Sequence, residues 1–285
     1  MIFQKFEAKT KEKSSIIGIG LGASEYHNQK ILQVSLNFLQ EYNSEVSFFG
    51  KKKNLNKLLD QNPDLIKNSR VRFIESEDPE NSIFEFLKNK SLQSIIRGSL
   101  SSSKFIENIK IHLKSEDINR LALLETYNGY QFFYGPVGID ECNNLENKII
   151  FLESAIKELD KLDINPKISI LSGGRIGDIG RDAKVDQTIQ EAEKIVEFVK
   201  EKYPNIMVSH DEILIEKAIE KKSNLIIAPD GISGNLIYRT LVHLGGGKAY
   251  GAIYMGIEPT IIDTSRVGND SEIYGALILA VALSK

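Results

Sequence analysis

Short apolar runs alternate with longer amphipathic stretches along the chain. In the first part, runs of three or four apolar residues are typical of buried strands. They lie at residues 16–19, 46–49, 71–74, 94–96 and 121–124. After the first run, apolar side chains recur at the spacing of one helix face, at Ile31, Val34, Phe38 and Leu39. Strands that alternate with helices indicate βα units and a parallel sheet.

A second series of the same kind follows residue 140. It opens with a helical stripe at Ile149, Leu152, Ile156 and Leu159. A long amphipathic helix is expected between Val185 and Val199, with Asp182 as its N-cap. Further strands are expected at residues 168–171, 225–228, 253–255 and 261–262. The pattern therefore predicts an α/β protein with a domain boundary near residue 140.

The charge balance excludes one class of partner. The chain has 285 residues and a formal net charge of −3. A nucleic-acid-binding protein needs a basic face to offset phosphate charge, so no nucleic acid is expected as a partner. The dense basic cluster is the run of three lysines at 51–53, and we interpret it as a solvated loop rather than an anion site.

The cysteine and histidine content excludes a zinc site, and the hydropathy pattern argues against a secreted or membrane protein. The chain has one cysteine, Cys142, and its four histidines lie far apart, so no zinc spacing is present and no metal is predicted. The first 15 residues are too charged for a signal peptide. No apolar run approaches the roughly 20 residues of a membrane span. The run at 276–283 is shorter and predicts a buried helix. We therefore expect a soluble, cytoplasmic protein without a membrane partner.

Two turns after strands in the first part of the chain are candidate anion sites. The glycines at residues 18–23 could lay a pyrophosphate on a helix N-terminus, but a tight turn that needs small residues is the favoured interpretation. Residues 97–103 combine an arginine with hydroxyl and N–H groups. A serine-rich helix cap with the arginine in a surface ion pair explains this segment equally well. The residues that would contact an anion are Arg97, Ser101, Ser102 and Ser103.

Two further candidate segments lie in the second part of the chain. Residues 172–182 carry four glycines, two arginines and two aspartates after a strand, where ligands bind in parallel sheets. A binding role is favoured over a passive one, with Arg175 as an anion contact. Residues 229–239 follow the most apolar strand, and Ser233 or Asn235 could cap the next helix. The contacts expected in this segment are Asp230, Ser233, Gly234 and Asn235.

The segment at residues 263–272 leads from a predicted strand into an apolar helix. Ser265 and Arg266 could bind an anion there, and Asp270 or Glu272 could act as a base. An alternative is a helix cap whose first-turn acids interact favourably with the helix dipole. These residues alone leave both interpretations open.

Together these motifs resemble those of a known family. Residues 224–239, followed by Ser265 and Arg266, resemble the C-terminal signature of the phosphate acetyl/butyryl transferases. Residues 97–103 and 212–218 resemble two more elements of that family, so the resemblance covers most of the chain.

Within that family, the segments at 172–182 and 228–240 are similar to those of the MtxX group, also called methanogenesis marker protein four. Its members are named as putative methyltransferase subunits. This resemblance implies a link to methanogenic one-carbon metabolism and association with a methyltransferase complex. It also implies a homodimer, because acetyltransferases of this type dimerise.

The resemblance implies a fold of the phosphotransacetylase and isocitrate/isopropylmalate dehydrogenase type. Such a fold has two parallel-sheet α/β domains with a cleft between them. The first domain would comprise residues 1–140 plus 258–285, and the second would comprise residues 141–257 with the motif at 229–239.

The resemblance also implies catalytic roles. Arg266 would bind phosphoryl or acyl oxygens, Ser265 would assist it, and Glu272 would take the thiol proton of coenzyme A, with Asp270 nearby. The chain departs from the family pattern at Glu272, which stands for an aspartate, and at Val267, which stands for a glycine.

We therefore expect a transferase that moves an acyl, phosphoryl or methyl group between an anionic small molecule and a phosphorylated cofactor such as coenzyme A. The alternative is a non-catalytic, ligand-binding accessory subunit on the same fold. A dehydrogenase of the isocitrate type ranks last, because the clustered metal-binding aspartates of that family are missing from the sequence.

Overall fold

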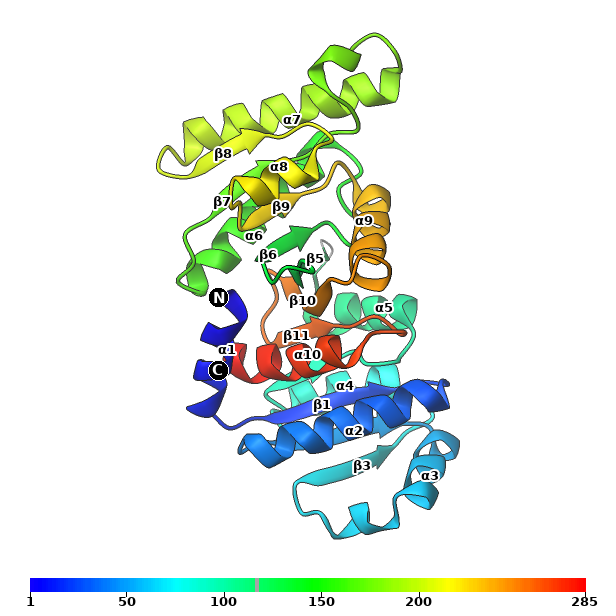
Figure 1. Cartoon of the computed structure of the whole chain (residues 1–285). Helices are drawn as coiled ribbons and strands as arrows, with labels where there is room; N and C mark the ends of the chain where they lie inside the picture. Colours follow the sequence, from blue (N-terminus) through cyan, green and yellow to red (C-terminus); the bar gives the residue numbers. More distant parts are fainter. Residues whose placement is uncertain (116–117) are drawn as a thin grey trace. The chain divides into compact units, whose positions relative to one another are not determined.

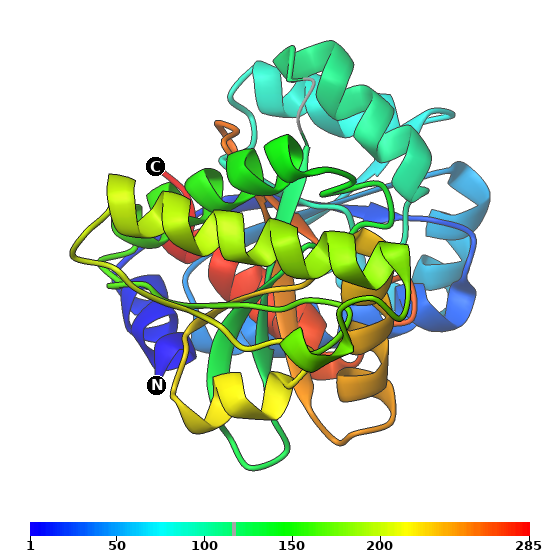
Figure 2. The ribbon, with the colours of Figure 1, turned by 90° about the horizontal axis from the view of Figure 1, so that it is seen from above.

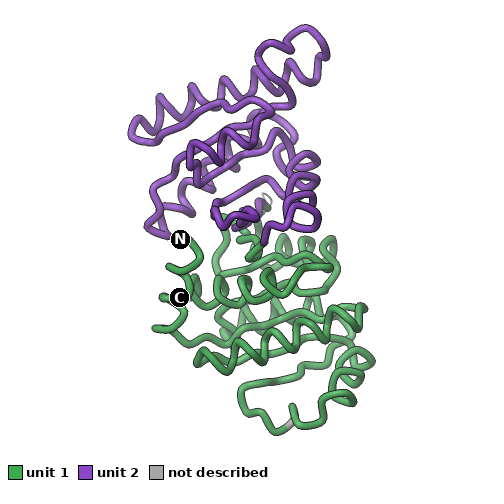
Figure 3. Tube along the Cα trace, in the orientation of Figure 1, with its two compact units in different colours: residues 1–118, 249–285 green, residues 119–248 purple. Residues whose placement is uncertain are grey.

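The computed structural model describes residues 1–115 and 118–285 (Figure 1). Contacts between Cα atoms divide the chain into two compact units, which Figure 3 distinguishes by colour. Unit 1 comprises residues 1–118 and 249–285, and unit 2 comprises residues 119–248. The domain bounds expected near residues 140 and 258 stay a prediction, because units of close packing are not by themselves domains.

The sheet of unit 1 is parallel except at β10. Its strands follow the order β3-β2-β1-β4-β11-β10, and β10 runs antiparallel to β11 whereas the other pairs are parallel. The strands are β1 (Ile16–Leu21), β2 (Glu45–Gly50), β3 (Val71–Glu75), β4 (Ser94–Ile96), β10 (Lys248–Met255) and β11 (Thr260–Asp263). Most residues of β1, β2 and β4 are buried, as expected for parallel strands covered on both faces.

Helices connect and cover these strands. They are α1 (Ile2–Lys11), α2 (Glu25–Glu41), α3 (Lys52–Gln61), α4 (Pro79–Lys88), α5 (Ser102–Leu113) and α10 (Asp270–Leu283), with a 3-10 turn at Pro63–Lys67. Helix α10 is buried almost throughout, which confirms the buried helix predicted at 276–283. It lies beside α1 in Figure 1, where the Thr10 hydroxyl donates to the Ile278 carbonyl over 3.1 Å.

The strands of unit 2 follow the order β5-β6-β9-β7-β8. The hairpin of β5 and β6 is antiparallel, and the other pairs are parallel. Its elements are β5 (Asn119–Glu125), β6 (Gln131–Gly135), α6 (Leu145–Lys161), β7 (Lys167–Ile170), a 3-10 turn (Ile176–Asp178), α7 (Ala183–Lys202), β8 (Met207–His210), α8 (Ile215–Glu220), β9 (Leu225–Ile227) and α9 (Gly231–His243). Figure 2 shows α6 and α7 side by side, where a buried ion pair joins Lys148 to Glu191.

The α/β fold class is confirmed, and two strands were missed. Strand β6 follows Asn128-Gly129, a hairpin signal that makes its pairing with β5 antiparallel. Strand β8 has four residues and is half-buried at a sheet edge, so its apolar pattern is weak. The predicted N-cap of α7 is confirmed, since Asp182 accepts from the N–H groups of Lys184 and Val185.

Close packing of α10 generates a stability prediction. A Cβ at Gly275 would lie 2.4 Å from Cα and 2.7 Å from the carbonyl oxygen of Tyr250. Backbone atoms cannot move aside cheaply, so overpacking of about 1–3 kcal/mol should exceed the roughly 1 kcal/mol that alanine gains over glycine in a helix. We expect Gly275→Ala to lower the urea midpoint. Gly177→Ala is the control, because its Cβ meets nothing within 4 Å, and equal midpoints for the two variants would contradict this packing.

Candidate functional site

The segment between β11 and α10 is a loop whose backbone is tied to the helix. The Glu272 carboxylate is 3% exposed, and its Oε1 accepts from the Ser265 N–H over 2.8 Å. A Cβ at Gly268 would lie 2.4 Å from Glu272 Oε2, so a larger residue there would require this carboxylate to shift. Val267, where the family pattern has glycine, is 59% exposed and free of this constraint.

Arg97 fixes the start of the same loop. Its side chain is 5% exposed, and its guanidinium pairs with Asp263 and donates to the Thr264 carbonyl. It also donates to the Leu100 carbonyl over 2.8 Å. The surface ion pair considered for Arg97 is therefore wrong, because the pair is buried. Contact of Arg97 with an anion stays a prediction, and the visible role of its planar fork is to join the ends of β4 and β11.

Two side chains of helix α2, Lys30 and His27, also contact the loop backbone. Lys30 Nζ donates to the Gly268 carbonyl over 3.2 Å. His27 is 3% exposed, and its ring is hydrogen-bonded to the Ser265 backbone. Burial lowers the pKa of His27, the nearby charges of Lys30 and Arg97 lower it further, and the bond to Ser265 opposes them. The fold therefore disfavours the charged form of this buried imidazole.

Arg266 is exposed on this loop, and it lines a pocket of about 530 Å³ in unit 1. The pocket lies after the carboxyl ends of β1, β2 and β4, at the starts of α2, α3, α4 and α5, where parallel sheets bind ligands. Every lining residue belongs to unit 1. Its basic side chains are Lys51, Lys53, Lys57, Lys104 and Arg266. Its acidic side chains are Glu25 and Glu80.

A hydrogen-bonded network forms one wall of the pocket. The Gly22 N–H donates to Ser99 Oγ over 2.6 Å, and the Ser99 hydroxyl donates to Asn28 Oδ1 over 2.6 Å. Asn28 and Asn54 both donate to the Gly22 carbonyl, over 2.9 and 2.8 Å. A Cβ at Gly22 would lie 2.2 Å from the Ser99 carbonyl oxygen. Such close approach requires a small residue, as the tight-turn interpretation of residues 18–23 expected.

The serines predicted at 101–103 begin α5 beside this pocket. Ser101 lines it, and its N–H donates to Glu80 Oε1 over 3.3 Å. Ser102 and Ser103 occupy the first turn of α5. Asp270 is exposed in the first turn of α10. Binding of an anion by these side chains stays a prediction.

The lysines of the pocket were missed. The run at 51–53 is exposed, as predicted, but it is not a loop, because Lys52 and Lys53 begin α3. Lys51 and Lys53 also line the pocket. Lys57 and Lys104 join them from α3 and α5. The available signal was position, since each segment follows a strand of the parallel sheet.

The remaining predicted residues belong to unit 2. Asp230 caps α9 by accepting from the Ser233 N–H over 2.8 Å, so the expectation that Ser233 or Asn235 is the cap is wrong. Asn235 instead donates to the Val137 carbonyl over 2.7 Å. A Cβ at Gly234 would lie 2.0 Å from the Pro136 carbonyl oxygen. These residues hold α9 against the segment after β6, and their contact with a ligand stays a prediction.

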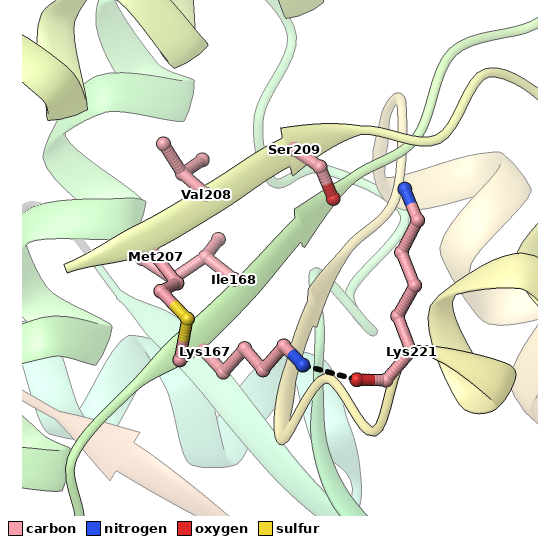
Figure 4. Close-up of a pocket in the computed structure, with 6 residues that line it drawn as sticks. All are labelled: Lys167, Ile168, Met207, Val208, Ser209 and Lys221. Carbon is pink, nitrogen blue, oxygen red and sulfur yellow. Dashed lines mark hydrogen bonds between the residues drawn. The ribbon is translucent and has the colours of Figure 1, made fainter.

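The glycine-rich loop at 172–182 is also in unit 2. Arg175 is exposed, and its N–H donates to Asp178 Oδ2 over 2.9 Å. A separate hollow of about 270 Å³ lies at the β7–β8 edge, lined by the residues in Figure 4. Within residues 1–115 and 118–285, no cluster of His, Cys, Asp or Glu could hold a metal ion. In the same ranges, no helix is long and apolar enough to cross a membrane.

Comparisons with known proteins agree with the motifs. A family model described as "Phosphate acetyl/butaryl transferase" matches residues 84–281. A Methanosarcina mazei protein named "Putative methyltransferase mtx subunit X" is 36% identical over 283 residues, 99% of this chain and 95% of that protein.

Two solved structures show the same fold. A phosphotransacetylase from Streptococcus pyogenes has a TM-score of 0.73 at 16% identity, covering 99% of this chain and 97% of that chain. A 4-hydroxythreonine-4-phosphate dehydrogenase from Klebsiella pneumoniae has a TM-score of 0.61 at 13% identity, covering 93% and 98%.

The buried pair of Arg97 generates a prediction. Arg97→Ala leaves Asp263 buried without its guanidinium partner, a change that costs about 3–5 kcal/mol. Arg72→Ala is the matched control, because Arg72 pairs with Glu45 at 3.0 Å but is 57% exposed, and such surface pairs contribute about 1 kcal/mol or less. Urea unfolding of both variants measures the difference. Similar losses would show that the Arg97 pair does not stabilise the loop.

The lowered pKa of His27 generates a pH prediction. Because the folded state binds this proton more weakly than the unfolded state, stability is kept above the ordinary histidine pKa of 6.5 and falls as pH falls below it. One group contributes at most about 1.4 kcal/mol per pH unit. We expect His27→Gln to reduce the fall in unfolding free energy between pH 7.5 and 5.5. Parallel curves for the two proteins would contradict the assignment.

Proposed function

The chain belongs to the phosphate acetyl/butyryl transferase family, in its mtx subunit X group, and on that premise we propose that it is a transferase for an acyl, phosphoryl or methyl group carried by a phosphorylated cofactor. The observation that supports this proposal is the placement of Arg266. The loop around it is held by partly buried hydrogen bonds, while its own side chain lines a pocket rich in cations.

Arg266 would act by electrostatic stabilisation. A guanidinium offers a planar fork of donors that fits a phosphoryl or carboxylate group bidentately. A donor already fixed in place needs no reorganisation when negative charge develops on the transferred group. The contacts of Ser265 with Glu272 and of Lys30 with Gly268 supply that fixed backbone.

The two acidic side chains near Arg266 differ in solvent exposure. Glu272 is buried and holds the Ser265 N–H, so we assign it a positioning role. Asp270 is exposed in the same helical turn and is the better placed proton acceptor. A base must come within hydrogen-bonding reach of the proton that it removes, a condition that exposure favours.

Coenzyme A fits the pocket by charge. Its phosphate groups match a lining that contains five basic side chains and two acidic ones. Bound coenzyme A would supply a thiol for acyl transfer, and the residues that would hold its phosphates are the lysines and Arg266. We extend the proposal to a homodimer that works in the cytoplasm, in methanogenic one-carbon metabolism, together with a methyltransferase complex.

A second candidate function is a ligand-binding accessory subunit without chemistry. It is favoured by the structural use of Glu272, because a carboxylate bonded to Ser265 and shielded from solvent is a poor base. Measured turnover of acetyl phosphate and coenzyme A distinguishes the two candidates, since the accessory subunit would bind without turnover.

Arg266→Lys tests the proposal. The substitution keeps the charge but removes the fork, so affinity for coenzyme A should fall about ten- to hundred-fold, corresponding to roughly 1.5–3 kcal/mol. The melting temperature should hardly change, because the side chain is exposed. Titration calorimetry of wild type, Arg266→Lys and the exposed control Arg72→Lys measures the effect. Equal affinities for all three would remove Arg266 from the site.

A further inference from the structure

The loops that follow β7 and β8 expose three isoleucines. Ile176 and Ile179 lie at the 3-10 turn after β7, Ile213 follows β8, and each is 51% or 52% exposed. The Ile179 N–H donates to the Ile176 carbonyl over 3.3 Å. The Ile176 N–H donates to Oε1 of Glu212, the neighbour of Ile213, over 3.0 Å. The three side chains therefore belong to one patch, which we call the isoleucine surface, and such clusters mark interaction sites more often than single exposed residues do.

Partly buried carboxylates fix the backbone under this surface. Asp178 Oδ2 accepts from the Arg175 N–H over 2.9 Å, and both carboxylate oxygens of Asp186 accept from the Gly180 N–H over 3.0 Å. Glu212 binds the 3-10 turn in the same way. The loop thus turns these carboxylates toward its own backbone and its isoleucines toward solvent. An apolar surface that is already ordered lowers the entropy cost of binding a partner.

Gly177 lies in this surface, between Ile176 and Ile179 along the chain. Its φ is outside the left-handed region, and a Cβ built there would meet no atom of the described residues within 4 Å. Neither the backbone conformation nor packing inside the described part of the chain therefore requires a glycine at this position. A bare backbone between exposed isoleucines allows the main chain of a partner to approach closely.

The charged side chains around the isoleucine surface indicate the chemistry of that partner. Arg175 and Arg181 are exposed, and Arg181 pairs with Asp178 at 2.5 Å. Arg175 forms no ion pair with any residue that the structure describes. A second copy of this chain would set arginine against arginine across a two-fold axis, whereas carboxylates would pair with these side chains. Arginine is also enriched in protein interfaces, where its planar fork fits a carboxylate.

From these observations we propose that the isoleucine surface docks a segment of another protein whose apolar side chains are flanked by Asp or Glu. The apolar side chains would cover the three isoleucines, and the carboxylates would pair with Arg175 and Arg181. This surface belongs to unit 2, whereas the pocket that Arg266 lines belongs to unit 1. The inference rests on the part of the proposed function that gives the chain a protein partner, and it does not depend on the transfer chemistry.

Fluorescence anisotropy with synthetic helical peptides tests this proposal. One peptide carries leucine along one face and glutamate on both flanks, and its counterpart carries lysine in place of glutamate. Wild type should bind the acidic peptide at least about tenfold more tightly than the basic one, because only the acidic peptide can pair with the arginines. Ile176→Ser and Ile179→Ser should each lose at least about tenfold in affinity for the acidic peptide. The matched control Ile111→Ser, at an isoleucine of α5 that is 64% exposed, should stay within about twofold of wild type. Equal binding of the two peptides, or equal losses in Ile176→Ser and Ile111→Ser, would overturn the proposal.

A charge variant tests the acidic flanks separately from the apolar contact. Arg175→Gln should weaken binding of the acidic peptide about three- to tenfold and make it less sensitive to salt, whereas the exposed control Arg72→Gln should do neither. Melting curves show whether each variant is folded. If an isoleucine variant is not folded, Arg175→Gln decides the question, and unchanged affinity and salt dependence in it would contradict an acidic partner.

Other occupants of the surface are outcomes of the same experiment. If Ile176→Ser abolishes self-association in analytical ultracentrifugation, or flotation with phosphatidylglycerol vesicles, while peptide binding is unchanged, the surface takes a second copy or a membrane and the proposal is wrong. Turnover of acetyl phosphate and coenzyme A by wild type is measured in parallel. Peptide binding without turnover would keep this surface and refute the transferase, and turnover without peptide binding would do the reverse.

Discussion

The guanidinium of Arg97 joins parts of the chain that lie 166 residues apart, through its pair with Asp263, and it also bonds to the Thr264 carbonyl. Separating the two buried charges would cost several kcal/mol, because each would lose its partner inside the protein. The pair therefore keeps the ends of β4 and β11 together. Ser265 and Arg266 follow directly from that junction. The backbone that would present Arg266 to a ligand therefore depends on a buried ion pair that touches no ligand itself.

Around that junction, the side chains that fix the loop backbone are different from the side chains that solvent can reach. Glu272, Lys30 and His27 fix the loop from α10 and α2, and each of these contacts is made to backbone. Arg266 and the pocket lysines stay accessible. A site built in this way holds its charges in place before a ligand arrives, which lowers the reorganisation needed for binding and for charge stabilisation.

The helices that begin at the pocket of unit 1 also differ in whether a side chain caps them. A side-chain cap contributes typically about 1 kcal/mol to a helix, and α2 and α4 have one. Helices α3 and α5, whose starts carry Lys53 and Lys104, forgo it. These two helix starts therefore lack the local stability that a side-chain cap supplies.

Local pattern by itself determined the α/β class, the strands of the parallel core, the Asp182 cap of α7 and the buried helix at 276–283, because each depends on neighbours in sequence. The motif residues, read as a family signature, predict a site at Ser265 and Arg266, and that stays a prediction. Only the tertiary structure decided that Arg97 is buried, that Asp230 caps α9, and that lysines after separate strands line one pocket. These outcomes depend on residues far apart along the chain, whose meeting no periodicity records.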